Sequence, residues 1–452
     1  MNASIHNLDL TALRRVNDNK RRIQAHRVLA RTGTIAVVLS RTLLLFVLTS
    51  VAAKLSRRQY NATQFGETVA AAFETLGGGF VKIGQLLSTR PELPEELTIP
   101  LRRLQDSLAP CSAHAVRSVI ESSLRLPLET VFSAIDPVPI GSASIAQVHR
   151  ATLRKNGADV AVKVRRPGVD ETIRIDARVF TNLARFLSWL PPFRGIPLQE
   201  ATREVVTTVE GQASFWLEAD RHRQFCELFK SGAPVRVPQL FDEYCTDEIL
   251  VMEYVPDLVR ITDPTLDELT HRNAVIAGLR GLYRMLFLEG LVHCDLHPGN
   301  ILVGREGMVV VVDFGFSARM GPSERAAFAR LFLSIALGDG VTAAKIVRET
   351  ALRSPEDLDS ASFEREIVEL IKASAGQRAS DFLVSAFVSS LFKVQRKYNI
   401  YGSPSFTMAI FSLTVYEGVI RHRCADLDFQ REAVPILLAA IQKKDEAAPA
   451  LN

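Results

Sequence analysis

One polar segment between two apolar stretches constrains this chain more than any other feature. Residues 293–300 read His-Cys-Asp-Leu-His-Pro-Gly-Asn, and residues 313–315 read Asp-Phe-Gly after the apolar run 308–312. An aspartate on a loop, an amide five residues later and an Asp-Phe-Gly after the next strand are what a kinase-type phosphoryl-transfer site needs. We assign Asp295 as the catalytic residue that positions or deprotonates the acceptor, and Asn300 and Asp313 as oxygen ligands of Mg²⁺.

The residue pattern of this segment also allows two different roles. His293, Cys294, Asp295 and His297 could form a transition-metal cluster, since the two histidines are spaced i, i+4 and would share a helix face. The Pro298-Gly299 pair indicates a loop instead. The segment could also be a loop with a purely structural role.

A strand lysine and a phosphate-binding loop belong upstream of such a site. Residues 160–164 read Val-Ala-Val-Lys-Val, so Lys163 is assigned to the α- and β-phosphates, although a lone strand lysine is more often solvated. Between two predicted strands, backbone N–H groups and serine hydroxyls could hold phosphate, or the residues could form a plain hairpin turn. The residues assigned to nucleotide binding are Gly141, Ser142, Ala143 and Ser144 of this loop, Lys163, and Glu253 and Val255 at the end of the apolar strand 249–252.

The basic charge of the chain is concentrated near its N-terminus. Residues 1–60 hold eleven lysines and arginines against two acids, whereas the net charge of all 452 residues is only +4. Because no aromatic residue lies among the basic ones before Phe46, we expect no nucleic-acid partner and favour an anionic membrane surface. The five cysteines are scattered without a CxxC pair, which is typical of a reducing, cytoplasmic setting.

The apolar stretch from Ile35 to Ala53 leaves three possibilities open. It could be a helix on a membrane surface or packed on the protein, a single membrane span, or a helix buried by an oligomer partner. Arg41 near its centre is costly in a span. Exposed apolar helices such as Ser403 to Val419 are a second possible route to membrane attachment.

Taken together, four segments resemble the UbiB/AarF (ADCK) family of atypical kinases over roughly residues 60–420. They are Lys82-Ile83-Gly84-Gln85 (its KxGQ motif), Gly141 to His149 (its alanine-rich nucleotide loop), Glu218-Ala219-Asp220 (its ExD motif) and the 293–300 loop. The resemblance implies that the KxGQ helices cover the site where a protein kinase admits its peptide. Lys82 and Gln85 would then point toward Glu218, Asp220 and the nucleotide as occluding, regulatory residues.

Two further features bear on activity, and only the first is a departure from the family pattern. The family has a glutamate six residues after its ExD glutamate, and this glutamate pairs with the strand lysine. This chain has Gln224 at that position, so Glu227 or Glu218 could pair with Lys163 instead. If the ion pair is only weakened, Gln224→Glu should raise turnover. Only Phe316 to Gly321 separate Gly315 from the next predicted helix, which leaves no room for an activation segment. This favours a small-molecule substrate or ATP hydrolysis over protein phosphorylation.

The expected fold is α+β: a bilobal protein-kinase-like fold with a small β-rich N-lobe, a larger helical C-lobe and an N-terminal helical extension. The expected domains are a basic, apolar arm (1–60), a KxGQ extension (61–110), an N-lobe (111–255), a C-lobe (256–445) and a tail (446–452). Long helical stretches are expected over about 168–190 and 199–230, and a proline-rich stop over 91–100.

The expected function is an atypical kinase or ATPase that binds Mg²⁺ and ATP between its lobes. The resemblance implies a role in isoprenoid-quinone or other prenyl-lipid metabolism, with peripheral membrane association, prenyl lipid as a ligand and lipid-biosynthesis proteins as further partners. The alternatives are a kinase acting on a protein or small molecule, and a nucleotide-binding scaffold without turnover, to which Gln224 lends support.

Overall fold

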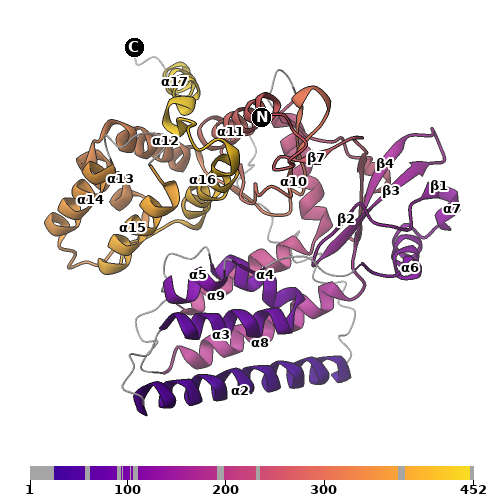
Figure 1. Cartoon of the computed structure of the whole chain (residues 1–452), viewed down its shortest axis with the longest axis horizontal. Coiled ribbons are helices and arrows are strands. Elements are labelled where there is room, and N and C mark those ends of the chain that lie inside the picture. The colour runs from indigo at the N-terminus through magenta and orange to yellow at the C-terminus, as the bar shows by residue number, and fades with distance from the viewer. Residues whose placement is uncertain are drawn as a thin grey trace, which may run out of the picture.

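The computed structural model describes residues 25–55, 62–88, 93, 95–101, 103–104, 110–190, 198–230, 235–374 and 382–447. The basic residues before position 25, Arg57, Arg58 and the end of the tail lie outside these ranges. The described chain forms three bodies in Figure 1: a twisted sheet, a large helical lobe and a layer of long helices beneath both. This confirms the α+β bilobal arrangement with a helical extension.

The small lobe is built on an antiparallel five-stranded sheet, in the order β1-β3-β4-β6 with β2 paired to β3. Its elements are α6 (Ala113–Leu124), α7 (Leu128–Val131), β1 (Phe132–Ile135), β2 (Gly141–Ser142), β3 (Ala146–Leu153), β4 (Asp159–Arg165) and β6 (Ile249–Glu253). Side chains alternate along β4, so Val160, Val162 and Val164 pack in one cluster with residues of α6. Lys163 therefore points to the opposite face of the sheet.

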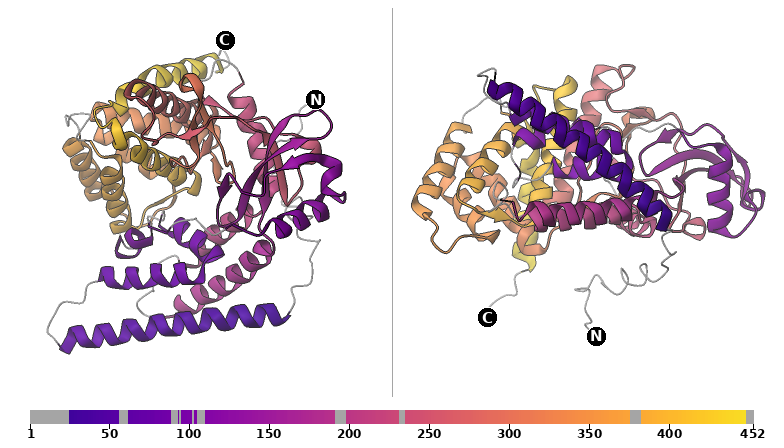
Figure 2. Two further views of the ribbon diagram at one scale, coloured as in Figure 1. Left: turned by 45° about the vertical axis from the view of Figure 1, so that its right-hand side comes forward. Right: turned by 90° about the horizontal axis from the view of Figure 1, so that it is seen from below.

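The helical layer contains more than the predicted extension. It consists of α2 (Ala25–Leu55), α3 (Ala62–Leu76), α4 (Gly78–Leu87), α5 (Glu95–Leu101), α8 (Val169–Leu187) and α9 (Leu198–Gln212). The rings of Phe73 and Phe180 lie 5.4 and 6.3 Å from that of Phe80, so α3, α4 and α8 share one core. The views in Figure 2 agree that α2 forms the outer edge of this layer.

The KxGQ helix α4 packs closely because of its glycines. A Cβ on Gly84 would come within 2.8 Å of the Phe73 ring, and a Cβ on Gly79 within 2.7 Å of an Asp176 carboxylate oxygen. Both glycines therefore serve close packing of α4 against its neighbours, α3 and α8. The backbone at Gly77 and Gly78 has positive φ, which lets the chain turn sharply between α3 and α4.

The C-lobe is mostly helical and encloses the largest apolar core. Helix α10 (Phe215–Leu228) leads into it from the helical layer. The remaining elements of this lobe are β5 (Val235–Arg236), β7 (Val259–Arg260), α11 (Glu268–Tyr283), η3 (Arg284–Glu289), β8 (Leu291–His293), β9 (Ile301–Val303), η4 (Arg305–Gly307), β10 (Val309–Val311), β11 (Ser317–Arg319), α12 (Pro322–Leu337), α13 (Gly340–Glu349), β12 (Ala351–Arg353), α14 (Ser360–Ser374), α15 (Val384–Lys397), β13 (Tyr401–Gly402), α16 (Pro404–Arg423) and α17 (Phe429–Ala447). The short turn η2 (Asp242–Tyr244) packs against the small lobe instead.

The predicted helical stretch 199–230 is confirmed and consists of two helices, α9 and α10, separated at Ala213 and Ser214. Two other expectations about helices were wrong. The proline-rich segment contains the helix α5, which includes Pro100. Helix α16 is a core helix rather than an exposed apolar one, since more than half of its residues are buried, among them Tyr416 and Val419. Membrane attachment through α16 is therefore excluded.

Candidate active site

The predicted strand lysine lies at the centre of an ion-pair cluster. The Lys163 ammonium donates to Glu218 Oε1 at 2.6 Å and to Asp313 Oδ1 at 3.1 Å. These residues come from β4 of the small lobe, helix α10 and the loop after β10. The structure thus brings together the strand lysine, the ExD glutamate and the Asp-Phe-Gly aspartate, which are far apart in sequence.

The charges of this cluster act on one another strongly. Burial alone would lower the pKa of Lys163, but Asp313 and Glu218 outweigh it and raise that pKa above its usual value. Burial raises the pKa of Glu218 to about 7, against the opposing effect of Lys163. Burial would also raise the pKa of Asp313, but the positive charges of Lys163 and Lys82 hold it well below its usual range. Asp313 is therefore a carboxylate at neutral pH.

The acidic partner of Lys163, which Gln224 left open, is Glu218. Glu218 is the partner of Lys163, whereas Glu227 pairs with Lys230 on the surface of the same helix. Gln224 donates to Asp220 at 2.7 Å and accepts from Arg319. A glutamine at 224 therefore leaves the lysine–glutamate pair intact, and the expected gain in turnover from a glutamate there has no structural basis.

The two acidic residues of the ExD motif have different surroundings. Because they are spaced i, i+2, they leave opposite sides of α10. Glu218 is buried against Lys163, while Asp220 is exposed and bonded to Gln224. Only the glutamate reaches the lysine–aspartate cluster.

The 293–300 segment is a loop between β8 and β9, as Pro298-Gly299 indicated. The Asn300 side chain donates to the backbone oxygen of Asp295 at 3.0 Å, and the Val312 N–H donates to the backbone oxygen of Asn300 at 3.1 Å. These bonds tie the Asp295 loop to the strand that precedes Asp313. Asp313 has φ of +62°, a strained conformation for a non-glycine residue that commonly marks a functional site.

A transition-metal cluster does not form here. Among the described residues, no group of three or more histidine, cysteine or acidic side chains is arranged to hold a metal ion. His293 is fully buried, and burial raises the pKa of the Cys294 thiol to about 12, so that thiol stays protonated. His297 lies 3.7 Å from Asp295 on the exposed side of the loop.

The loop 141–144, which we predicted to bind nucleotide, is held in place by an arginine. The Arg166 guanidinium donates to the Ala143 carbonyl oxygen and to the Ser142 hydroxyl, both at 2.7 Å. The Ser144 hydroxyl is buried and has no hydrogen-bond partner in the described part of the chain. A buried hydroxyl without a partner is costly. Gly141 lies at the start of the loop, in β2.

Glu253 and Val255, which we predicted to bind nucleotide, lie at the end of β6 and in the segment that follows it. Glu253 ends β6; its carboxylate pairs with Arg236 and its N–H donates to Gln239. Val255, two residues further on, is buried. The Glu253 side chain is therefore already paired, and a nucleotide would have to meet the backbone here.

Lys82 and Gln85 of the KxGQ motif also have different surroundings. The charge of Lys82 acts on Asp313 and lowers its pKa, which agrees with a position near the cluster. Gln85 donates instead to the backbone oxygen of Leu104 at 3.1 Å. The amide nitrogen of Gln85 is thus bound within the helical layer rather than to the ExD carboxylates.

Sequence reasoning missed two arginines that hold this site. Arg166 fixes the nucleotide loop, and Arg221 donates to the Gly315 carbonyl oxygen at 2.6 Å, which links α10 to the Asp-Phe-Gly turn. The signal for Arg221 was its place directly after the ExD motif. Arg166 could be suspected only as the residue before Pro167.

Comparison with known proteins agrees with this geometry. The profile of the ABC1 atypical kinase-like domain matches residues 103–347, more than half of the chain. Proteins named "Probable protein kinase UbiB" are similar: the one from Aeromonas hydrophila is 30% identical over 82% of this chain and 69% of its own length. The one from Marinobacter nauticus is 30% identical over 84% and 70%.

A solved structure supports the fold independently. The complex of Rv3197 with erythromycin, from Mycobacterium tuberculosis, superposes with a TM-score of 0.52 at 21% identity, covering 88% of this chain and 98% of that one. At this identity the likeness concerns the fold alone. With the domain match, the relatives and the lysine–glutamate–aspartate cluster, the chain belongs to the UbiB/AarF family of atypical kinases.

Proposed function

We propose that this protein binds Mg²⁺ and ATP between its lobes and hydrolyses ATP in support of isoprenoid-quinone or other prenyl-lipid metabolism at a membrane. The observation that carries the proposal is the Lys163–Glu218–Asp313 cluster, with bonds of 2.6 and 3.1 Å, beside the Asp295 loop. Membership of the UbiB/AarF family is what suggests the quinone context.

The residues present suit a magnesium–nucleotide complex. Asp313, an ionised carboxylate, and Asn300, an amide tied to the Asp295 loop, are oxygen ligands of the kind Mg²⁺ prefers. The ion would neutralise charge on the terminal phosphates. Lys163 would hold the α- and β-phosphates as a point charge, and the loop of Gly141, Ser142, Ala143 and Ser144 would offer N–H and hydroxyl groups.

Asp295 would orient or deprotonate the attacking group. Its carboxylate is partly exposed next to His297, and its backbone is fixed by Asn300. A carboxylate held near the transferred phosphoryl group in this way contributes by positioning rather than by covalent chemistry.

The kinase alternative finds support in the names of the relatives, which call them protein kinases. The short link after the Asp-Phe-Gly turn argues against a peptide substrate, because only six residues separate Gly315 from the first residue of α12. That length leaves no platform for a docked peptide. The scaffold alternative loses the support that Gln224 gave it, because Lys163 has an acidic partner in Glu218.

Membrane contact is proposed through helix α2. Its segment Leu29–Leu48 is long and apolar enough to cross a membrane. One face, however, is fixed to the protein: Ile35 is buried, and Arg31 donates to both carboxylate oxygens of Asp176 at 2.7 and 2.8 Å. The opposite face exposes leucines and valines. A helix bound in this way is suited to lie along a bilayer surface.

The decisive experiment is Mg-dependent phosphate release from ATP by the purified full chain, with and without anionic liposomes, compared with Asp295→Asn. We expect liposome-stimulated release that the variant loses. Transfer of the γ-phosphate to a stable acceptor would favour the kinase alternative. Nucleotide binding with no release above that of the variant would favour the scaffold.

A further inference from the structure

A second buried cation follows the strand lysine on β4. Arg165 lies two residues after Lys163, so both side chains leave the same face of the sheet. The Arg165 side chain is only 7% exposed. Burying a guanidinium is costly unless its N–H groups meet acceptors, so its partners reveal what it holds together.

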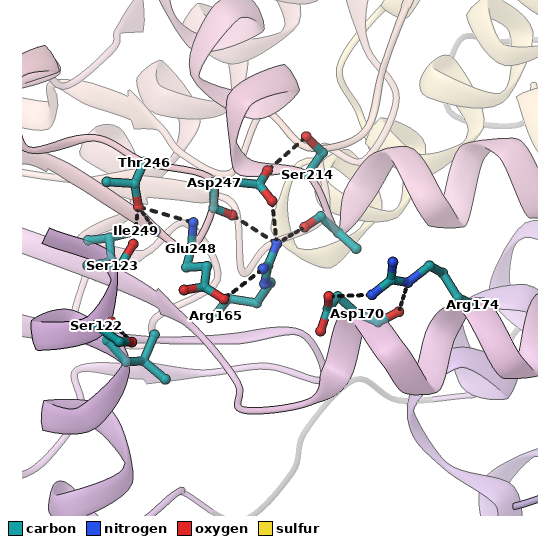
Figure 3. A network of polar contacts seen from close by, with 12 residues as sticks. Ser122, Ser123, Arg165, Asp170, Arg174, Ser214, Thr246, Asp247, Glu248 and Ile249 are labelled. Atoms are coloured by element: carbon teal, nitrogen blue, oxygen red, sulfur yellow. Dashed lines mark hydrogen bonds and ion pairs between the residues drawn. The ribbon is translucent and has the colours of Figure 1, made fainter. Parts of the chain in front are cut away.

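Those partners belong to two segments that flank the site (Figure 3). Arg165 Nη1 donates to the Ala213 carbonyl oxygen at 3.0 Å, and to the backbone oxygen and the carboxylate of Asp247 at 2.9 and 3.0 Å. Its Nη2 donates to the Glu248 carboxylate at 3.0 Å. Ala213 precedes helix α10, and Asp247 and Glu248 precede strand β6.

Asp247 extends this network to the first turn of α10. The Ser214 hydroxyl donates to the other carboxylate oxygen of Asp247 at 3.2 Å, and Ser214 is the N-cap residue of α10. The Glu218 N–H donates to the Ser214 backbone oxygen at 3.2 Å, which closes the first helical turn. Arg165 on one strand is therefore connected through two residues to the turn that carries Glu218.

We infer that Arg165 is a positioning residue that locks the start of α10 against β4, so that Lys163 and Glu218 meet before any nucleotide binds. The inference rests on the proposed function for its catalytic consequence, but the lock itself is a property of the free protein. A lysine could not replace it, because one ammonium cannot reach acceptors on three sides as the planar guanidinium does.

Losing the lock has a specific expected consequence. If α10 moves, the lysine–glutamate pair is assembled in only a fraction of the molecules. The apparent affinity for nucleotide is then the intrinsic affinity multiplied by that fraction. Saturating nucleotide would restore the assembled state, because it binds that state better. The variant should therefore show a raised KM for MgATP with kcat nearly unchanged, whereas general destabilisation would lower the melting temperature without this split.

The first test needs no nucleotide. Amide hydrogen exchange of residues 218–222, the first amides of α10 with helical acceptors, is compared in the wild type, Arg165→Met and Arg174→Met. Arg174 is a matched control, since it is an arginine on the neighbouring helix α8 that pairs with the carboxylate of Asp170, one turn away. We expect faster exchange in the first turn of α10 in Arg165→Met only. Unchanged exchange there would overturn the inference.

The second test asks whether Arg165 acts through Lys163. We expect Arg165→Met to raise the KM for MgATP about tenfold in the wild-type background and to add nothing to Lys163→Met. Equal effects in both backgrounds would contradict a role through Lys163. If Arg165→Met does not fold, Asp247→Asn with Ser214→Ala breaks the same link from the other side. A wild type that neither binds nor hydrolyses MgATP would refute the proposed function, and hydrogen exchange would still decide on the lock.

Discussion

At the scale of single residues, the site depends on which charges meet and which do not. Sequence motifs pointed to Lys163, Glu218 and Asp313 and left Glu218 and Glu227 open as partners of the lysine; the structure shows that the partner is Glu218. The 2.6 Å bond between Lys163 and Glu218 assigns to the ExD glutamate the part that other kinases give to a glutamate on their helix αC. This pairing has consequences for the pH dependence of nucleotide binding and for substitution at position 224.

The first prediction concerns pH. Because the pKa of Glu218 is about 7, its carboxylate takes up a proton as the pH falls from 8 to 6, and the ion pair with Lys163 is lost. We expect MgATP affinity to fall over this range in the wild type. Glu218→Gln should bind more weakly at pH 8 and show little dependence on pH. Isothermal titration at several pH values measures both.

Stability should change in the opposite direction. A carboxyl whose pKa is raised by folding binds its proton more tightly in the folded state. The contribution of Glu218 to the free energy of unfolding therefore increases as the pH falls from about 7 toward the pKa that this group has in the unfolded chain. Thermal unfolding over the same range is therefore the control. A fall in affinity that merely followed a fall in melting temperature would contradict the assignment to Glu218.

The second prediction concerns Gln224. Gln224→Glu would place a carboxylate beside Asp220, whose oxygen now accepts from the glutamine amide at 2.7 Å, and would leave Lys163 paired with Glu218. Like charges at this spacing on a helix are mildly destabilising, by about 0.2–0.5 kcal/mol. We expect no gain in ATP turnover, measured as phosphate release. A clear increase would show that residue 224 reaches the lysine after all.

At the scale of secondary-structure elements, the close approach of helices in the extension depends on glycine. An added Cβ at Gly66 of α3 would overlap the backbone oxygen of Glu96 and come within 2.9 Å of Pro100, both on α5. The backbone oxygen of Glu96 cannot move away from an added Cβ as the end of a flexible side chain can. Gly33 on α2, by contrast, has no atom within 4 Å of the same position.

These two glycines make a matched pair for mutation. Gly66→Ala should force α5 away from α3 and cost about 1–3 kcal/mol, as overpacking does in other cores. Gly33→Ala should be neutral or stabilise by up to about 1 kcal/mol, because alanine favours the helix. Denaturant unfolding followed by circular dichroism measures both. Equal stabilities of the two variants would contradict the packing seen at Gly66.

The elements also show where sequence reasoning succeeded. Alternation along β4 correctly indicated a strand, and the short link after Gly315 correctly indicated an early α12. The place of α8 in the helical layer was not predictable, because Asp176 finds its partner Arg31 far away along the chain. The break at Ala213 was equally hidden, since it is fixed by Arg165, from a distant strand. Local patterns carry no information about such long-range partners.

At the scale of the whole molecule, helix α2 forms an outer edge (Figure 2), and its two faces differ in burial. Arg31 and Ile35 face the protein, and Phe46 meets the Phe65 ring at 5.0 Å. The exposed side chains of α2 include Leu44 and Leu48, one turn apart and each more than half exposed. An apolar helix face of this kind fits the boundary region of a bilayer.

The final prediction tests this face directly. Leu44→Gln with Leu48→Gln should leave folding intact, because both side chains are exposed, and should weaken binding to anionic liposomes by about tenfold or more through lost apolar burial. Leu337→Gln with Leu352→Gln, at exposed leucines of the C-lobe, is the matched control and should bind as the wild type does. Co-flotation with liposomes measures binding. Because Arg31 and Asp176 hold α2 to the folded body, the wild-type protein should also be released from membranes by carbonate; retention would mean that α2 leaves the protein and crosses the bilayer.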